Sequence, residues 1–180
     1  MKKLNNYTSI ILPLFLLVPF ISFSQHEALT DSANTKLMTA AREIITATGI
    51  CALITLDEDG VARARAMDGF PPNNNFVIWF GTNPKSRKVK QIQNDPRVTL
   101  YYFDKMTASY VLIHGEAQII DDVAEKEKHW KKEWPAFYPN YPDGYALIKV
   151  TPEWMELVSE SRGIIGDSLT WQPQIVWFEK

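Results

Sequence analysis

The chain has 180 residues, of which 46% are hydrophobic and 22% are charged. This composition is typical of a globular protein with a core of ordinary size, and it excludes intrinsic disorder. The formal net charge of -2 excludes a general attraction for nucleic acid, so any anion-binding site must be local. Cys51 is the single cysteine, which excludes an intramolecular disulfide and a multi-cysteine metal site. It lies in an apolar run and is predicted to be a core residue.

Residues 1–24 have the pattern of a secretory signal peptide. Lys2 and Lys3 precede an apolar run over residues 10–23, and Ser22 and Ser24 are the small residues that define a cleavage site. The apolar run is shorter than the roughly 20 residues that a membrane span needs. We therefore predict cleavage after Ser24 and a protein of the periplasm or the extracellular space, without stable membrane association after cleavage. An uncleaved anchor is the alternative.

A helix is predicted next. Apolar residues recur at helical spacing over residues 37–45, and Gly49 offers a C-terminal cap. Asp31 or Ser32 is expected to cap the start of this helix.

A β-hairpin is predicted after the helix. Residues 50–56 form a continuous apolar strand, residues 57–60 a turn, and residues 61–67 a second strand. In the second strand Arg63 and Arg65 share one face and alanines occupy the other. The alanine face is expected to pack closely against another layer. The arginine face is either part of a site or an ordinary solvated edge.

The most informative stretch is a strand over residues 76–80 followed by a helix predicted to begin at Ser86. The first turn of this helix carries Arg87 and Lys88. Cations there are unfavourable by roughly 0.3 to 1 kcal/mol each, because a helix N-terminus carries a partial positive charge. A phosphate would accept the free N–H groups, the Ser86 hydroxyl and charge-assisted bonds from Arg87 and Lys88. We predict a phosphorylated ligand between this helix start and the arginine strand.

The rest of the chain is predicted to be mostly strand. Gly115 is expected to mark a bulge, and Asp121 or Asp122 to cap a polar helix that runs through Trp134. The predicted strands span residues 98–103, 109–120, 145–150, 155–158 and 175–178. The fold class is mostly β with flanking helices, an antiparallel barrel, and one domain is predicted over residues 25–180.

Three blocks of residues resemble a known family, the pyridoxamine 5'-phosphate oxidase-like FMN-binding split barrels, and within it the general stress protein 26 type. Residues 60–67 are similar to the family's Gly-x-Pro-x-x-Arg segment, in which Arg65 takes the place of the arginine that reaches the flavin phosphate. Residues 82–88 resemble its Thr-Asn-x-x-Ser-Arg-Lys motif. Residues 110–115 resemble the strand in which one side chain contacts the flavin ring of a partner subunit. That side chain is Tyr110 here.

The resemblance implies FMN as the cofactor and a homodimer with the flavin at its interface. The flavin phosphate is a near-dianion that Arg and Lys side chains hold by charged hydrogen bonds, and the flat ring needs small contacts along a strand. The predicted cofactor-binding residues are Arg65, Ala66, Met67, Thr82, Ser86, Arg87, Lys88 and Tyr110. At Phe70 and Tyr110 the oxidases carry lysine and glutamine, so the resemblance implies the cofactor more strongly than the oxidation of pyridoxamine phosphate.

The function predicted from these residues is that of an exported FMN-binding oxidoreductase that transfers hydride to or from an unidentified small molecule. No catalytic residue and no metal site is predicted. The alternative is a non-enzymatic flavin- or heme-binding protein on the same barrel. Aromatic residues are frequent after Trp130, and they wall a ligand cleft, line a dimer interface or pack the core.

Overall fold

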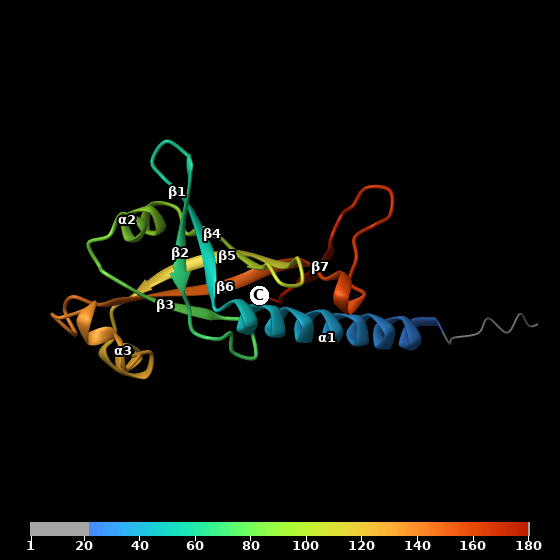
Figure 1. Cartoon of the computed structure of the whole chain (residues 1–180), viewed down its shortest axis with the longest axis horizontal. Helices are drawn as coiled ribbons and strands as arrows, with labels where there is room; N and C mark the ends of the chain where they lie inside the picture. The colour runs from blue at the N-terminus through green and yellow to red at the C-terminus, as the bar shows by residue number, and fades with distance from the viewer. Residues whose placement is uncertain (1–21, 180) are drawn as a thin grey trace, which may run out of the picture.

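The computed structural model describes residues 22–179, which form an antiparallel sheet with helices around it (Figure 1). Residues 1–21, which hold most of the predicted signal peptide, lie outside the described residues. The elements in chain order are α1 (Ser22–Thr48), β1 (Ile50–Leu56), β2 (Ala62–Asp68), β3 (Ile78–Thr82), α2 (Arg87–Asn94), β4 (Arg97–Asp104), β5 (Ser109–Ile120), α3 (Val123–Lys128), a 3-10 turn (Trp134–Ala136), β6 (Ala146–Val158), a 3-10 turn (Glu160–Arg162) and β7 (Gln174–Trp177).

The strands run in the order β2-β1-β4-β5-β6-β3, and β7 pairs with β6. All the pairs are antiparallel. The two end strands, β2 and β3, approach each other through an isolated bridge between Gly69 and Phe80. The barrel is therefore split between β2 and β3, which confirms the predicted fold class. Helix α2 follows β3 directly and lies at this split.

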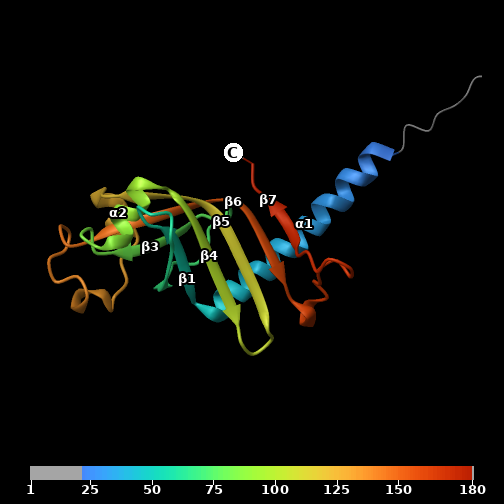
Figure 2. The same cartoon turned by 90° about the horizontal axis from the view of Figure 1, so that it is seen from above.

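The inner face of the sheet is covered by α1, which crosses the strands in Figure 2 while its N-terminal part extends past them. Alternate strand residues point to this face and pack against the helix. The buried cluster includes Leu37, Ala41 and Ile44 of α1 with Leu53, Leu100 and Ile113 of the sheet. Cys51 also belongs to this cluster, as predicted. None of the helices formed by residues 22–179 is long and apolar enough to cross a membrane.

The opposite, outer face of the sheet carries many apolar side chains that no described element covers. The alanines of β2 lie on this face and are exposed, so no described element of the single chain supplies the layer that was predicted to pack against them. The outer face also holds Ile54, Tyr101, Phe103, Tyr110, Leu112 and Trp177.

Most predicted elements are confirmed, some with shifted ends. β1 and β5 have the predicted bounds, and α2 begins after Ser86 as expected. The bulge at Gly115 is confirmed by a register shift between His114 and Gly115. A Cβ at Gly115 would lie 2.1 Å from the Thr151 carbonyl oxygen, so this close approach requires glycine.

Three predicted boundaries are wrong. Helix α1 begins at Ser22 rather than near Asp31, because residues 22–31 contain no proline or glycine to stop it. Strand β3 begins at Ile78 because Phe76 has a φ of 57°, which breaks the extended chain. At its other end the strand continues through Gly81 to Thr82. The polar helix ends at Lys128 and does not reach Trp134.

Two predicted strands form one continuous strand, β6. Pro152 lies between the two predicted strands, and proline cannot donate to a sheet ladder. It lies opposite Gly115 at the bulge, where the ladder is already irregular, so β6 continues through it.

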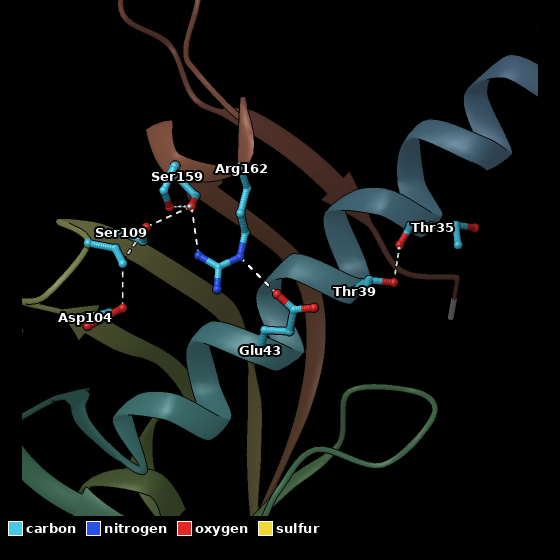
Figure 3. A network of polar contacts seen from close by, with 9 residues as sticks. Thr35, Thr39, Glu43, Asp104, Ser109, Ser159 and Arg162 are labelled. Atoms are coloured by element: carbon cyan, nitrogen blue, oxygen red, sulfur yellow. Dashed lines mark hydrogen bonds and ion pairs between the residues drawn. The ribbon is translucent and has the colours of Figure 1, made fainter.

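A polar network fastens the barrel end to α1 (Figure 3). The fully buried Ser109 donates to the Ser159 hydroxyl at 2.8 Å, and Arg162 Nη1 donates to the same hydroxyl at 3.1 Å. Arg162 Nε also donates to the Glu43 carboxylate on α1 at 3.0 Å. The network joins β5, β6 and α1, and its arginine has a carboxylate partner.

Candidate functional site

A groove of about 460 Å³ lies at the split between β2 and β3. Ala66 and Met67 line it from β2, Thr82 from the end of β3, and Lys88 from the first turn of α2. These four residues come from three elements, and all four were predicted to bind the cofactor. The split of the barrel therefore brings predicted site residues together at one place.

Arg65 lies beside the groove on the inner face of β2, where its guanidinium donates hydrogen bonds to neutral oxygens. Its Nη1 donates to Thr55 Oγ1 at 2.7 Å and to the Leu53 carbonyl at 3.2 Å. Its Nη2 donates to Gln91 Oε1 at 2.8 Å, and Thr55 also donates to that oxygen at 2.7 Å. These hydrogen bonds fix the guanidinium between β1 and α2 without neutralising its charge.

Arg63 differs from Arg65 although the two share a face. Its Nε donates to Asp57 Oδ2 at 2.7 Å, and this bond lowers the pKa of Asp57. Arg63 is thus paired within its own hairpin. The two arginines therefore differ in their partners, a carboxylate for Arg63 and neutral oxygens for Arg65.

Lys88, Thr82 and Ser86 form a small cluster at the start of α2. Lys88 Nζ donates to Thr82 Oγ1 at 3.1 Å, and the Ser86 hydroxyl lies 3.3 Å from the same atom. Ser86 is the N-cap residue, yet its side chain makes no capping bond to the helix. The first N–H groups of α2 therefore have no side-chain acceptor, and no acidic residue stands in its first turn.

The cations at this helix start lack negative partners. Among residues 32–179, whose side chains the structure describes, no carboxylate forms an ion pair with Arg65, Arg87 or Lys88. Burial and then the neighbouring Arg87 lower the pKa of Arg65, and burial and then Arg65 lower the pKa of Lys88. Arg65 and Lys88 are thus partly away from water and bonded to neutral acceptors, and the exposed Arg87 lies close enough to act on Arg65. A bound anion would relieve this arrangement.

Aromatic residues of the segment after α3 form the other wall of the groove. Trp134, Phe137 and Tyr138 line it, and Phe137 is 75% exposed at its mouth. Trp134 packs on Gly81, where an added Cβ would lie 2.5 Å from the indole ring. Two of the three alternatives left open for the aromatic residues hold together here, because Trp134 and Tyr138 wall the groove and also belong to a buried cluster with Tyr145.

Tyr110 is the predicted site residue that the single chain does not bring to the groove. It lies on the outer face of β5 opposite Phe103 and Val158, and its ring centroid is 5.7 Å from that of Tyr101. Burial raises its pKa. This position is open to a second molecule, and the contact predicted for Tyr110 requires a partner subunit.

Sequence reasoning missed Thr55 and Gln91, which hold Arg65. Gln91 lies one helical turn after Arg87, so the helix period places it on the same side of α2. Its link to Arg65, however, depends on how α2 packs across the hairpin, and no local pattern indicates that.

The fold and the groove together define the class as a split-barrel protein with a cationic, groove-shaped site at its split. The sequence matches the family described as pyridoxamine 5'-phosphate oxidase like over residues 36–164. The chain therefore belongs to the pyridoxamine 5'-phosphate oxidase-like family. No curated protein matches the chain in a comparison of sequences.

Solved structures with the same fold include proteins of the general stress protein 26 type. A Clostridium acetobutylicum protein related to general stress protein 26 is 20% identical, with a TM-score of 0.65 over 80% of this chain and 95% of that one. General stress protein 26 of Bacillus anthracis is 24% identical, with a TM-score of 0.58 over 76% of this chain and 98% of that one. A heme-binding protein of Mycobacterium smegmatis is 14% identical, with a TM-score of 0.57 over 76% of this chain and 56% of that one.

Proposed function

We propose that this protein binds FMN at the groove and acts as an FMN-dependent oxidoreductase. The observation that carries the proposal is the cation cluster of Arg65, Arg87 and Lys88, in which Arg65 and Lys88 are bonded to neutral acceptors and none of the three forms an ion pair with a described carboxylate. The residues fit the cofactor because a flavin phosphate supplies the missing negative charge, and each charged hydrogen bond to it contributes roughly 1.5 to 3 kcal/mol.

The flavin ring is assigned to the rest of the groove. Ala66 and Met67 of β2 line one side of the groove, and Trp134, Phe137 and Tyr138 form an apolar wall on the other side. A flat aromatic ring with a polar edge suits a groove of this kind. When bound, the flavin supplies the hydride chemistry. The part of the protein is to orient the ring, to hold its phosphate and to limit water along the aromatic wall.

The proposal includes a homodimer, with the outer face of the sheet as its interface. Phe103 on β4 and Trp177 on β7, which are 51% and 70% exposed, lie on the same face of the sheet as the three exposed alanines of β2. Exposed apolar surface of this extent supports an interaction site. Tyr110 lies on this face, as the contact with a partner's flavin requires.

The dimer is tested by replacing one exposed alanine of the outer face. Ala64→Arg places a charge at the interface without touching the core, so the monomer is expected to fold. Light scattering after size exclusion should show a dimer for the original protein and a monomer for the variant. A protein that is monomeric before the substitution contradicts the dimer.

We also propose that the protein is exported and cleaved after Ser24, on the basis of the n-region, apolar run and small residues of the sequence. The mass of the protein recovered from the periplasm or the medium tests this. A species that begins at Gln25 is expected, and full-length protein confined to the cytoplasm contradicts it.

Two measurements separate enzyme from binding protein. The purified protein is mixed with FMN and, separately, with heme, and the absorbance spectrum shows which of them is bound. Stopped-flow mixing of the flavin-bound protein with nicotinamide nucleotides or quinols then follows bleaching of the flavin band. Reduction by one of these donors is expected. A bound flavin that no donor reduces favours the binding role, and a heme spectrum without flavin binding overturns the proposal.

A further inference from the structure

A charged pair, Asp68 and Lys131, joins the end of β2 to the segment that carries the aromatic wall of the groove. Lys131 Nζ bonds to Asp68 Oδ2 at 2.7 Å and donates to the Gly69 carbonyl at 3.2 Å. Asp68 lines the groove, and it is the one carboxylate among the lining residues. Lys131 belongs to the segment after α3, which Figure 1 shows at the β3 end of the sheet. The groove therefore has one acidic position, and a lysine from its other side reaches that position.

Aromatic rings fix the position of Lys131. Its Nζ lies 5.1 Å from the centroid of the Phe70 ring and 5.2 Å from that of the Trp134 ring. Both rings attract the ammonium group through their π-faces, and the Lys131 side chain is 18% exposed. The lysine therefore holds the Asp68 carboxylate from a fixed place, so little freedom remains for that carboxylate to lose when a ligand binds.

The Asp68 carboxylate keeps hydrogen-bonding capacity for a ligand. A carboxylate has two acceptor oxygens, and Lys131 bonds to one of them, Oδ2. Among residues 32–179, whose side chains the structure describes, no other group pairs with Asp68, and its side chain is 55% exposed. Its Oδ1 can therefore accept a hydrogen bond from a donor in the groove.

The order of side chains along β2 matches the order of groups along FMN. Arg65 belongs to the cation cluster, Ala66 and Met67 line the groove without charge, and Asp68 follows them. FMN has its phosphate at one end, then the flat ring, and at the far edge of the ring a pyrimidine whose N3–H is a hydrogen-bond donor. A carboxylate complements that donor with a charge-assisted bond. The dimethylbenzene edge of the ring has no donor, and packing it on Asp68 would remove water from the charge without replacing its hydrogen bonds.

We infer that Asp68 is a specificity residue that accepts a hydrogen bond from the flavin N3–H, and that Lys131 is the positioning residue that holds its carboxylate. The inference rests on the proposed function, because it places the flavin ring in the groove. It deepens that function by assigning the direction of the ring, with the pyrimidine edge at the end of β2. A salt bridge that only tied the two walls together would not distinguish flavins that differ at N3.

The test compares FMN with 3-methyl-FMN, in which a methyl group replaces the N3 hydrogen, by fluorescence titration of the full-length protein. FMN should bind about tenfold or more tightly, as expected for one charged hydrogen bond. Asp68→Ala removes the acceptor, so the ratio of the two dissociation constants should fall to about threefold or less.

The role of Lys131 is tested by Lys131→Met, with Lys132→Met as the matched control. Without the lysine the carboxylate is no longer held in place, so Lys131→Met should also lower the ratio of the two dissociation constants. Lys132 is exposed and does not line the groove, so its loss should leave the ratio within about twofold of the original value. The ratio separates positioning from stability, because a variant that only loosens the fold weakens both flavins equally.

The outcomes separate the two proposals. Dissociation constants of FMN and 3-methyl-FMN within about threefold of each other in the original protein overturn the role of Asp68 and leave the proposed function standing. A ratio that Asp68→Ala leaves unchanged also overturns it, because another group would then distinguish the two flavins. Equal weakening of both flavins in Lys131→Met overturns the positioning role. Binding of neither flavin overturns both proposals.

Discussion

Two arginines of this molecule, Arg65 and Arg162, are both partly buried and both held by hydroxyl groups, yet their charges are treated differently. Arg162 donates to the Glu43 carboxylate as well as to Ser159, and its network joins α1 to the barrel end (Figure 3). Arg65 donates to neutral oxygens and lies near Arg87 and Lys88. The comparison indicates that an arginine with a carboxylate partner serves the fold, whereas the cluster without one is proposed to bind an anion.

The largest effect is expected when the cluster loses two of its charges. The double variant Arg65→Met and Lys88→Met removes two charged hydrogen bonds to the FMN phosphate, each of roughly 1.5 to 3 kcal/mol. The affinity for FMN should fall by about 100-fold or more, as measured by quenching of flavin fluorescence.

The matched control for this variant is Lys85→Gln. Lys85 precedes α2, has an exposed side chain and does not line the groove. Its loss should therefore change the FMN affinity by no more than about twofold. Equal losses in the control and the double variant would mean that overall positive charge, rather than the cluster, attracts the ligand.

The next effect concerns the stability of the other network. Ser159→Ala leaves the buried Ser109 hydroxyl and Arg162 with one partner fewer, so the free energy of unfolding should fall by about 1 to 3 kcal/mol. Urea unfolding measures this change. Ser168→Ala, at an exposed position outside this network, should stay within about 0.5 kcal/mol. The FMN affinity should be unchanged in both variants. A large loss of FMN affinity in Ser159→Ala would show that the Ser159 network also supports the cofactor site.

The two arginines are compared directly by the same substitution. Arg162→Met should lower the free energy of unfolding by about 0.5 to 1.5 kcal/mol, because it removes a neutral and a charged hydrogen bond at a partly exposed site. Arg65→Met should change it less, since the lost bonds are offset by relief of repulsion from the neighbouring cations. Unfolding in urea without ligand measures both changes. A larger loss of unfolding free energy in Arg65→Met than in Arg162→Met would show that the hydrogen bonds of Arg65 mainly stabilise the fold.

The smallest effect is a pH dependence that comes from Lys88. Burial and then Arg65 lower its pKa below 10.5 in the folded protein, whereas the unfolded chain keeps the ordinary value. Between these two pKa values the unfolded chain binds more protons, so the free energy of unfolding rises with pH. The free energy of unfolding of the original protein minus that of Lys88→Met should therefore increase as the pH approaches 10.5. A difference that falls would mean that a negative group raises the pKa of Lys88, and a flat difference would mean that the pKa of Lys88 does not change on folding.

The cation cluster could be predicted from the sequence because its parts are local. Ser86, Arg87 and Lys88 follow one another at a helix start, and the period of a strand places Arg65 on a known face. Their electrostatic conflict is visible without a structure. The walls of the groove are different, since Trp134 reaches Gly81 only through the path of the segment after α3, where a polar helix was expected to continue.

The remaining errors share one physical cause, which is that the partner of a residue lies far away in the chain. Thr55 and Gln91 hold Arg65 across two packed elements, and no periodicity indicates this. Pro152 is accepted in β6 because Gly115 forms a bulge on the neighbouring strand. The exposure of the β2 alanines depends on whether a second subunit covers them.

The most direct test of the account compares FMN with riboflavin, which has the same ring and lacks the phosphate. If Arg65, Arg87 and Lys88 form a phosphate site, two or three charged hydrogen bonds separate the two ligands, and FMN should bind about 100-fold or more tightly than riboflavin. Titration of the full-length protein with each flavin, followed by fluorescence at constant salt, gives the ratio. Dissociation constants within about threefold of each other would contradict the central claim, because the cation cluster would then make no distinction between a phosphate and a hydroxyl group.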